Sequence, residues 1–218
     1  MQKIKGIIFD LDGTLADTLP LCVQAFRQSI EPLTSTSLTD AEIIATFGPS
    51  EEGTIMALAP DHYDQAVTSF LQLYETMHDM CPDPFPDIRD LLDLLKARGI
   101  RIAMVTGKGP HSTTISLKQF GISDYFEFIE TGSPLGPRKQ QCIQYVLDQW
   151  PSLQKEEVIY VGDMAGDVTA SRAAGVAVIG AAWAPAGDAH GLKASHPDEL
   201  FYTVGDFKEW LTPLIPRA

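Results

Sequence analysis

Two carboxylates, Asp10 and Asp12, stand two residues apart, directly after the apolar run Ile7-Ile8-Phe9 and before Gly13. The apolar run predicts a buried strand, and Gly13 predicts a tight turn behind it. Carboxylates are costly to bury without a partner, so their position at a strand end needs a chemical reason. A metal-assisted site in which one carboxylate attacks and the other transfers a proton would use both groups.

Further polar residues stand where other apolar runs would meet their following loops: Thr106, Gly107, Lys108, Arg138, Lys139, Asp163 and Asp167. In an open α/β sheet, ligands bind at the carboxyl ends of the strands. We therefore expect acids, a hydroxyl group and cations to meet at one edge of the sheet. Asp163 and Asp167 could also cap the helix that begins near residue 164, because Asp is a good N-cap residue.

The elements that must position these residues alternate along the chain. Strands are expected at 4–9, 100–105, 125–129, 158–161 and 176–179, with helices at 88–98, 111–120, 139–150 and 165–174. Near-continuous apolar strands that alternate with helices are typical of a parallel sheet covered on both faces. We predict an α/β fold, a doubly wound parallel (Rossmann-like) sheet of about five strands.

The segment from residue 17 to residue 83 does not follow this alternation. It predicts helices at 19–30, 39–47, 51–58 and 61–78. The three prolines within residues 81–86 cannot continue a helix and predict a stiff connection. We expect a core domain of residues 1–16 and 84–218 with the catalytic site, and a helical cap domain of residues 17–83 that closes over it.

In this order, the motifs resemble the haloacid dehalogenase (HAD) superfamily of hydrolases, in the phosphoglycolate phosphatase-like and β-phosphoglucomutase-like branch with a helical cap. The resemblance covers the whole chain and rests on four features: Asp10-Leu11-Asp12-Gly13-Thr14, the hydroxyl of Thr106, Lys139, and Gly162-Asp163 followed by Asp167. It implies a Mg2+-dependent phosphohydrolase that acts on a small phosphorylated metabolite through an aspartyl-phosphate intermediate.

The resemblance also implies a role for each matching residue. Asp10 would be the nucleophile, and Asp12 would protonate the leaving oxygen and then deprotonate the attacking water. Thr106 and the backbone N–H of Gly107 would bind phosphoryl oxygens. Lys139 would balance the carboxylates and stabilise the transferring group. Arg138, the adjacent residue, is an alternative candidate for the role of Lys139.

The Mg2+ ion would take oxygen ligands from the same motifs. Asp10, the backbone carbonyl of Asp12 and Asp163 would bind the ion directly. Asp167 would lie in or just behind this ligand shell, orienting a ligand water or Lys139, unless it serves only as a helix cap. Lys108 is a further candidate for substrate binding, and two placements are open for it, in solvent or beside the phosphate.

Two other readings of the function stay open. Asp12 argues against family members that cleave carbon–halogen or carbon–phosphorus bonds, which usually lack an acid at that position. A sugar phosphomutase uses the same core, however, and remains the main alternative to a phosphatase. A non-catalytic regulatory or binding relative is disfavoured, because a site without catalytic activity need not keep the costly groups Asp10, Asp12, Lys139 and Asp163.

The composition and charge of the chain exclude some classes of binding partner. A formal net charge of −13 argues against binding to nucleic acids or anionic membranes, and no apolar run is long enough to span a bilayer. The three cysteines are widely spaced and form no metal pattern, which indicates reduced thiols in a cytoplasmic protein. A small phosphorylated substrate is the expected partner, and the protein is expected to be a monomer or a homodimer.

The expected cap is strongly acidic. Between residues 17 and 86 there are eleven acids and a single arginine or lysine, Arg27. A cap for a doubly anionic substrate needs cations to meet the second charge. We therefore expect a neutral or cationic leaving group. The segment Gly48-Pro49-Ser50-Glu51-Glu52 is expected to reach the site, with Ser50 contacting the substrate.

Overall fold

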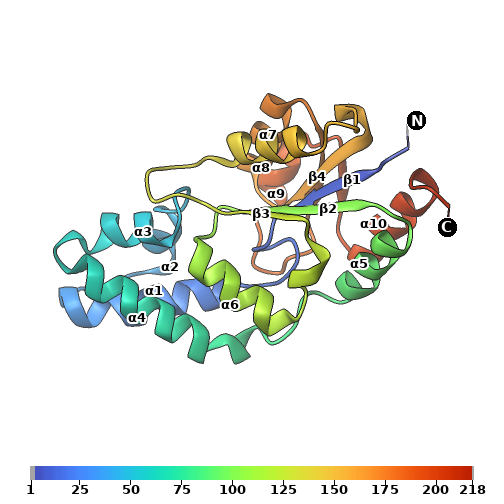
Figure 1. The fold of residues 1–218 in the computed structure, drawn as a ribbon. Helices are drawn as coiled ribbons and strands as arrows, with labels where there is room; N and C mark the ends of the chain where they lie inside the picture. Colours follow the sequence, from blue (N-terminus) through green and yellow to red (C-terminus); the bar gives the residue numbers. More distant parts are fainter. Residues whose placement is uncertain (1–2, 218) are drawn as a thin grey trace.

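The computed structural model describes residues 3–217. Its centre is a sheet of six parallel strands in the order β3-β2-β1-β4-β5-β6 (Figure 1). The strands are β1 (Gly6–Phe9), β2 (Arg101–Val105), β3 (Phe128–Glu130), β4 (Val158–Gly162), β5 (Ala177–Ala181) and β6 (Glu199–Phe201). β1 pairs with β2 on one side and with β4 on the other. The residues that follow these three strands therefore meet at one edge of the sheet.

Helices cover both faces of this sheet: α5 (Ile88–Ala97), α6 (Pro110–Phe120), α7 (Lys139–Gln149), α8 (Ala165–Ala174), α9 (Ala189–Ala194) and α10 (Val204–Leu211). Ile7 and Phe9 of β1 share one hydrophobic cluster with α5, α6 and α10. Ile8 lies in a second cluster with α7, α8 and α9. Alternate residues of β1 thus face opposite helical layers. This is the doubly wound α/β arrangement that the sequence predicts.

The sheet differs from the expectation in two details. It has six strands rather than about five, because Glu199–Phe201 pairs with β5 as an edge strand. That strand has three residues and begins with an acid, so it lacks the continuous apolar pattern of a buried strand. The third strand begins at Phe128 rather than at Tyr125, because Ser123–Tyr125 forms a 3-10 turn.

Four helices are inserted between β1 and the rest of the sheet: α1 (Leu19–Thr34), α2 (Asp40–Ile44), α3 (Glu51–Leu58) and α4 (Tyr63–Thr76). Figure 1 shows them as a separate group beside the sheet. They share a hydrophobic cluster in which the rings of Phe26 and Phe70 lie 4.5 Å apart. α1 is longer than expected and α2 is shorter. α4 is also shorter than expected, because 3-10 turns at Pro60–His62 and His78–Met80 flank it.

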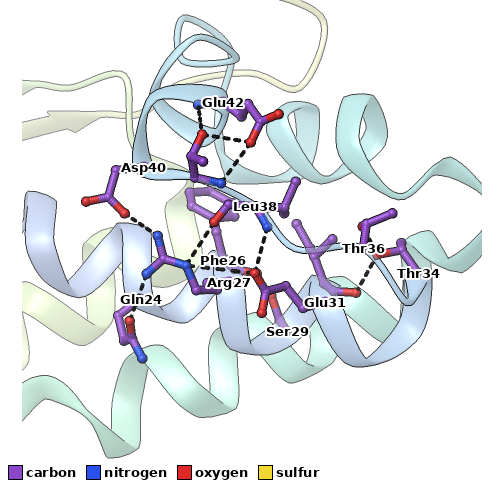
Figure 2. A network of polar contacts seen from close by, with 12 residues as sticks. Gln24, Phe26, Arg27, Ser29, Glu31, Thr34, Thr36, Leu38, Asp40 and Glu42 are labelled. Atoms are coloured by element: carbon purple, nitrogen blue, oxygen red, sulfur yellow. Dashed lines mark hydrogen bonds and ion pairs between the residues drawn. The ribbon is translucent and has the colours of Figure 1, made fainter.

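Arg27 joins α1 to the segment that leads into α2 (Figure 2). Its guanidinium donates hydrogen bonds of 3.1 Å to the side chain of Gln24 and to the carbonyl of Leu38. It also forms an ion pair with Asp40. The single arginine of the insertion is therefore used to hold the insertion together.

Hydrogen bonds from the start of α3 and from α4 are among the contacts that dock the insertion on the core. The backbone N–H of Ser50, just before α3, donates to the carbonyl of Ser133 at 2.9 Å. The hydroxyls of Tyr74 in α4 and Ser116 in α6 lie 2.8 Å apart, and both side chains are buried. α3 consequently begins beside the loops that follow β2 and β3.

The structure also gives the lengths of the helices and the environment of the cysteines. No helix among residues 3–217 has the length and apolarity needed to cross a membrane. The three cysteines, Cys22, Cys81 and Cys142, are buried free thiols.

Candidate active site

Asp10 lies directly after β1 and is buried, with 4% of its surface exposed. Its backbone N–H donates to the carbonyl of Val161, which extends the pairing of β1 with β4 by one residue. One carboxylate oxygen accepts the N–H of Leu11 at 2.7 Å, and the other accepts the ammonium of Lys139 at 2.5 Å. The carboxylate is therefore held in a fixed orientation by its own turn and by a cation from α7.

Lys139 also donates to Asp167, so its ammonium bridges two carboxylates. Asp167 is fully buried, and its second oxygen accepts the N–H of Met164 at 2.9 Å. Asp167 therefore caps the start of α8 and at the same time faces Lys139. Arg138, the rival of Lys139, lies away from this group and pairs with Glu130 at 3.3 Å, half exposed.

Asp10, Asp163 and Asp167 form the acidic cluster, in which one oxygen from each carboxylate lies within 4.8 Å of the others. The hydroxyl of Thr14 donates to Asp163 at 3.5 Å. Gly13 has a φ of +71°, and a Cβ at this position would overlap the carboxylate of Asp163. The turn after β1 can therefore approach Asp163 this closely only with glycine.

The donor set of this cluster fits a hard divalent cation such as Mg2+, which prefers carboxylate and carbonyl oxygens. Burial raises the pKa of Asp10 to about 6, although Lys139 lowers it in part. Burial, together with the nearby Asp167 and Asp10, raises the pKa of Asp163 well above its usual range. The single positive charge of Lys139 does not offset the negative charge of three buried carboxylates. A divalent cation bound between them would offset the remainder.

Mg2+ is expected to raise the melting temperature by about 5 °C or more at pH 7.5, and by clearly less at pH 5. The folded-state pKa of Asp10, about 6, exceeds its ordinary value of 3.8. Its contribution to stability is therefore full below pH 3.8 and is lost as the pH rises through 6. Mg2+ offsets this loss where the carboxylates are ionised and must displace protons where they are not.

Thermal unfolding followed by circular dichroism with and without Mg2+ measures this effect. NaCl at matched ionic strength is the control for general screening by salt. A shift of equal size at both pH values would contradict the ionisation that we assign to the cluster.

Asp12 has other partners than the acidic cluster. Its carboxylate accepts the hydroxyl of Thr18 and lies 3.4 Å from the ammonium of Lys108. It is one-third exposed, unlike the other acids of the site. Asp10 and Asp12 thus have different partners, Lys139 for Asp10 and Lys108 with Thr18 for Asp12, so their carboxylates can serve different tasks.

Thr106 and Gly107 follow β2 at the same edge of the sheet. The hydroxyl oxygen of Thr106 accepts the N–H of Lys108 at 3.2 Å, and no hydrogen bond within residues 3–217 uses its proton. The side of Gly107 where a Cβ would project is open, with no atom within 4 Å. The backbone N–H of Gly107 donates no hydrogen bond within the described residues, so it and the Thr106 hydroxyl are available donors at the strand end.

Lys108 is buried, which excludes the solvent-facing placement that the sequence left open. Its ammonium lies 3.1 Å from Glu51, 3.2 Å from the thiol of Cys22 and 4.4 Å from the centre of the Tyr74 ring. Burial by itself lowers the pKa of Lys108, but Asp12 and Glu51 raise it well above its ordinary value. Lys108 is therefore charged and joins the insertion to Asp12.

Ser50 and Glu51 bring the insertion to the site, at the segment expected from the sequence. The hydroxyl of Ser50 donates to Glu52 at 2.5 Å, and no hydrogen bond joins it to Asp10, Asp163 or Asp167. The closer contact belongs to Glu51, which pairs with Lys108. Sequence reasoning missed this role of Glu51, because no local pattern links it to a lysine 57 positions later.

A family model described as haloacid dehalogenase-like hydrolase matches residues 7–181 of the chain. Pyrophosphatase PpaX of Bacillus pumilus (strain SAFR-032) is 28% identical over 207 residues, which cover 94% of this chain and 95% of that protein. Pyrophosphatase PpaX of Oceanobacillus iheyensis is 29% identical over 213 residues and covers 97% of each.

Solved structures with the same fold are also similar to this chain. A haloacid dehalogenase-like family hydrolase, SP0104 from Streptococcus pneumoniae, superposes with a TM-score of 0.76 at 26% identity and covers 95% of this chain and 98% of its own. A predicted phosphoglycolate phosphatase from Haemophilus somnus 129PT has the same fold, with a TM-score of 0.80 at 24% identity and coverage of 96% and 99%. The chain therefore belongs to the haloacid dehalogenase-like hydrolase family, as its ordered motifs predicted.

Proposed function

We propose that this phosphatase hydrolyses a small phosphorylated metabolite in a Mg2+-dependent reaction, through an aspartyl-phosphate formed on Asp10. The observation that carries the proposal is the pairing of buried Asp10 with Lys139, inside a cluster of carboxylates that also contains Asp163. A carboxylate that is oriented by two hydrogen bonds and surrounded by cation-binding groups is suited to attack a phosphorus atom.

In the first step, an oxygen of Asp10 bonds to phosphorus, and the bond from phosphorus to the leaving oxygen breaks. Asp12 gives its proton to that oxygen. In the second step, Asp12 takes a proton from water, the water oxygen bonds to phosphorus, and the carboxylate of Asp10 leaves. Asp12 is suited to both transfers because it lies two residues from Asp10 and is partly exposed, so its carboxylate is accessible to the leaving oxygen and to water.

Phosphoryl oxygens need donors during both steps. The free hydroxyl proton of Thr106 and the backbone N–H of Gly107 supply two of them at the end of β2. Lys139 supplies a positive charge beside the nucleophile. These groups bind and orient the phosphoryl group while charge accumulates on it.

Asp10, Asp163 and the backbone carbonyl of Asp12 would hold Mg2+. Asp167 would lie in or just behind this ligand shell, where it also holds Lys139 and the start of α8 in place. The ion would neutralise the repulsion between the anionic nucleophile and the anionic phosphoryl group.

In this proposal the inserted helices form a cap domain of residues 17–83, over a core domain of residues 1–16 and 84–218. The support is the hydrophobic cluster that these helices share and their contacts with the core at Ser50 and Tyr74. The cap would exclude water from the site and move aside to admit substrate.

Pyrophosphate is a second candidate substrate, since similar chains of 28% and 29% identity are named pyrophosphatase. A phosphomutase on the same core is the remaining catalytic alternative. It would move the phosphoryl group between sugar positions instead of releasing it as inorganic phosphate.

Hydrolysis of p-nitrophenyl phosphate tests the proposal. We expect turnover with Mg2+, loss of turnover on addition of EDTA, and recovery when Mg2+ is restored. Release of inorganic phosphate from sugar phosphates, without formation of an isomeric sugar phosphate, separates a phosphatase from a mutase. Turnover that survives complete removal of divalent cations would contradict the proposed use of the acidic cluster.

A further inference from the structure

Lys108 is shared between the site and the insertion. Its ammonium lies 3.4 Å from Asp12 and 3.1 Å from Glu51, and its side chain is 1% exposed. Asp12 is the residue that meets the leaving oxygen in the proposed reaction, so Lys108 and Glu51 lie beside the leaving group. Lys108 thus joins Glu51 of the insertion to the residue that acts on the leaving oxygen.

Glu51 accepts two hydrogen bonds at the start of α6, besides its ion pair with Lys108. One of its oxygens accepts the N–H of Gly109 at 2.5 Å, at the start of α6, and the other accepts the hydroxyl of Ser112 at 2.5 Å. Together with Lys108, these donors have the chemistry of an anion-binding site at a helix N-terminus. The carboxylate of Glu51, which is 8% exposed, fills that position.

The described insertion itself has no arginine or lysine that is free to bind an anionic group of the substrate. Arg27 is the only one between residues 17 and 86, and its guanidinium is held by Gln24, Leu38 and Asp40 (Figure 2). It therefore cannot meet a second negative charge without leaving the contacts that join α1 to α2.

From this geometry we infer that Glu51 determines the leaving-group selectivity of the enzyme, by holding Lys108 and the start of α6 so that an anionic leaving group is rejected. The inference rests on the proposed function. A carboxylate or a second phosphate on the leaving group would meet Asp12 and Glu51, and it could reach Lys108 only by displacing Glu51. Phosphate esters of neutral alcohols meet no such repulsion.

The inference also concerns pyrophosphate. Its leaving group is phosphate, which is anionic. This chain should therefore hydrolyse pyrophosphate poorly compared with esters of neutral alcohols, although similar chains are named pyrophosphatase.

A matched pair of esters tests the inference. 2-Hydroxyethyl phosphate and phosphoglycolate have leaving groups of the same length that differ in a neutral hydroxymethyl group and a carboxylate. We expect the wild type to prefer 2-hydroxyethyl phosphate by at least about ten-fold in kcat/KM, since like charges at close range are strongly unfavourable. Equal turnover of the two esters by the wild type overturns the inference without any variant.

The variant Glu51→Gln removes the carboxylate charge and keeps the shape. We expect it to shift the ratio toward phosphoglycolate by about ten-fold or more, because Lys108 is then free to meet the new anion. Combined with Lys108→Met, the same substitution should lose this gain. Lys108 keeps Asp12 as a partner in Glu51→Gln, so the variant is expected to fold, which a melting curve checks.

Glu75→Gln is the matched control and makes the same chemical change. Glu75 is an exposed residue of α4 in the same insertion and has no ion pair within the described part of the chain. Its ratio should stay within about two-fold of the wild type, as for an acid without a cation partner. A folded Glu51→Gln with the wild-type ratio, or an equal shift in Glu75→Gln, overturns the inference but leaves the phosphatase proposal intact. No turnover of any ester, including p-nitrophenyl phosphate, overturns both.

Discussion

Asp10→Asn is expected to lower kcat by at least about 10⁴-fold on every phosphate ester that the wild type hydrolyses. The amide presents no anionic oxygen to phosphorus, so the aspartyl-phosphate cannot form. The fold should persist, because Asn keeps the size of the side chain and removes a buried carboxylate from a cluster of three. Without Mg2+ the variant should melt at the same temperature as the wild type or higher, since burial raises the pKa of Asp10 to about 6.

Kinetics and thermal unfolding separate the two effects of this substitution. The stabilisation by Mg2+ should shrink in Asp10→Asn, because one of the proposed ligands is lost. Asp61→Asn, at an exposed position of the insertion, makes the same chemical change away from the site and should leave both measurements unchanged. Residual turnover above about 1% of the wild type would mean that another group attacks phosphorus.

The parts of the structure that the sequence predicts are those that local patterns determine. β1 and the turn with Gly13 are adjacent in the chain, so the apolar run, the two acids and the glycine together indicate a strand, a site and a sharp turn. The alternation of apolar strands with helices predicts a doubly wound sheet. That sheet then brings the ends of β1, β2 and β4 together without any knowledge of side-chain contacts.

Contacts between distant segments could not be predicted in this way. The pairing of Glu51 with Lys108 depends on how the insertion docks on the core, and Lys108 lies outside the acidic segment of residues 17–86. The edge strand β6 has three residues and an acid at its start, so pairing with β5 rather than its own pattern makes it a strand. Tertiary context decides such elements.

The choice between Lys139 and Arg138 shows the same limit. Neighbouring cations in a loop have similar sequence signals, and only the start of α7 determines which of them points toward Asp10. In the structure, Lys139 bridges Asp10 and Asp167, while Arg138 pairs with Glu130 at the surface. The two residues should therefore differ sharply in their effect on catalysis.

Lys139→Met is expected to lower kcat by about 10³-fold, with a smaller change in KM, because its charge acts on the transferring group and on the nucleophile. Lys139 lowers the pKa of Asp10 against the effect of burial. Without it Asp10 should keep its proton to higher pH, so the acidic limb of the residual pH–rate profile should move upward. A merely structural role would lower activity without this shift.

Arg138→Met is the matched control for Lys139→Met, since it removes a neighbouring charge that is half exposed and paired only with Glu130. Its kcat should stay within about three-fold of the wild type, as expected for a surface ion pair. The two variants are compared by steady-state kinetics across pH, with circular dichroism to establish folding. If both lose activity equally, or if Lys139→Met keeps the wild-type acidic limb, the charge beside Asp10 does not act on the nucleophile and the proposed role of Lys139 is wrong.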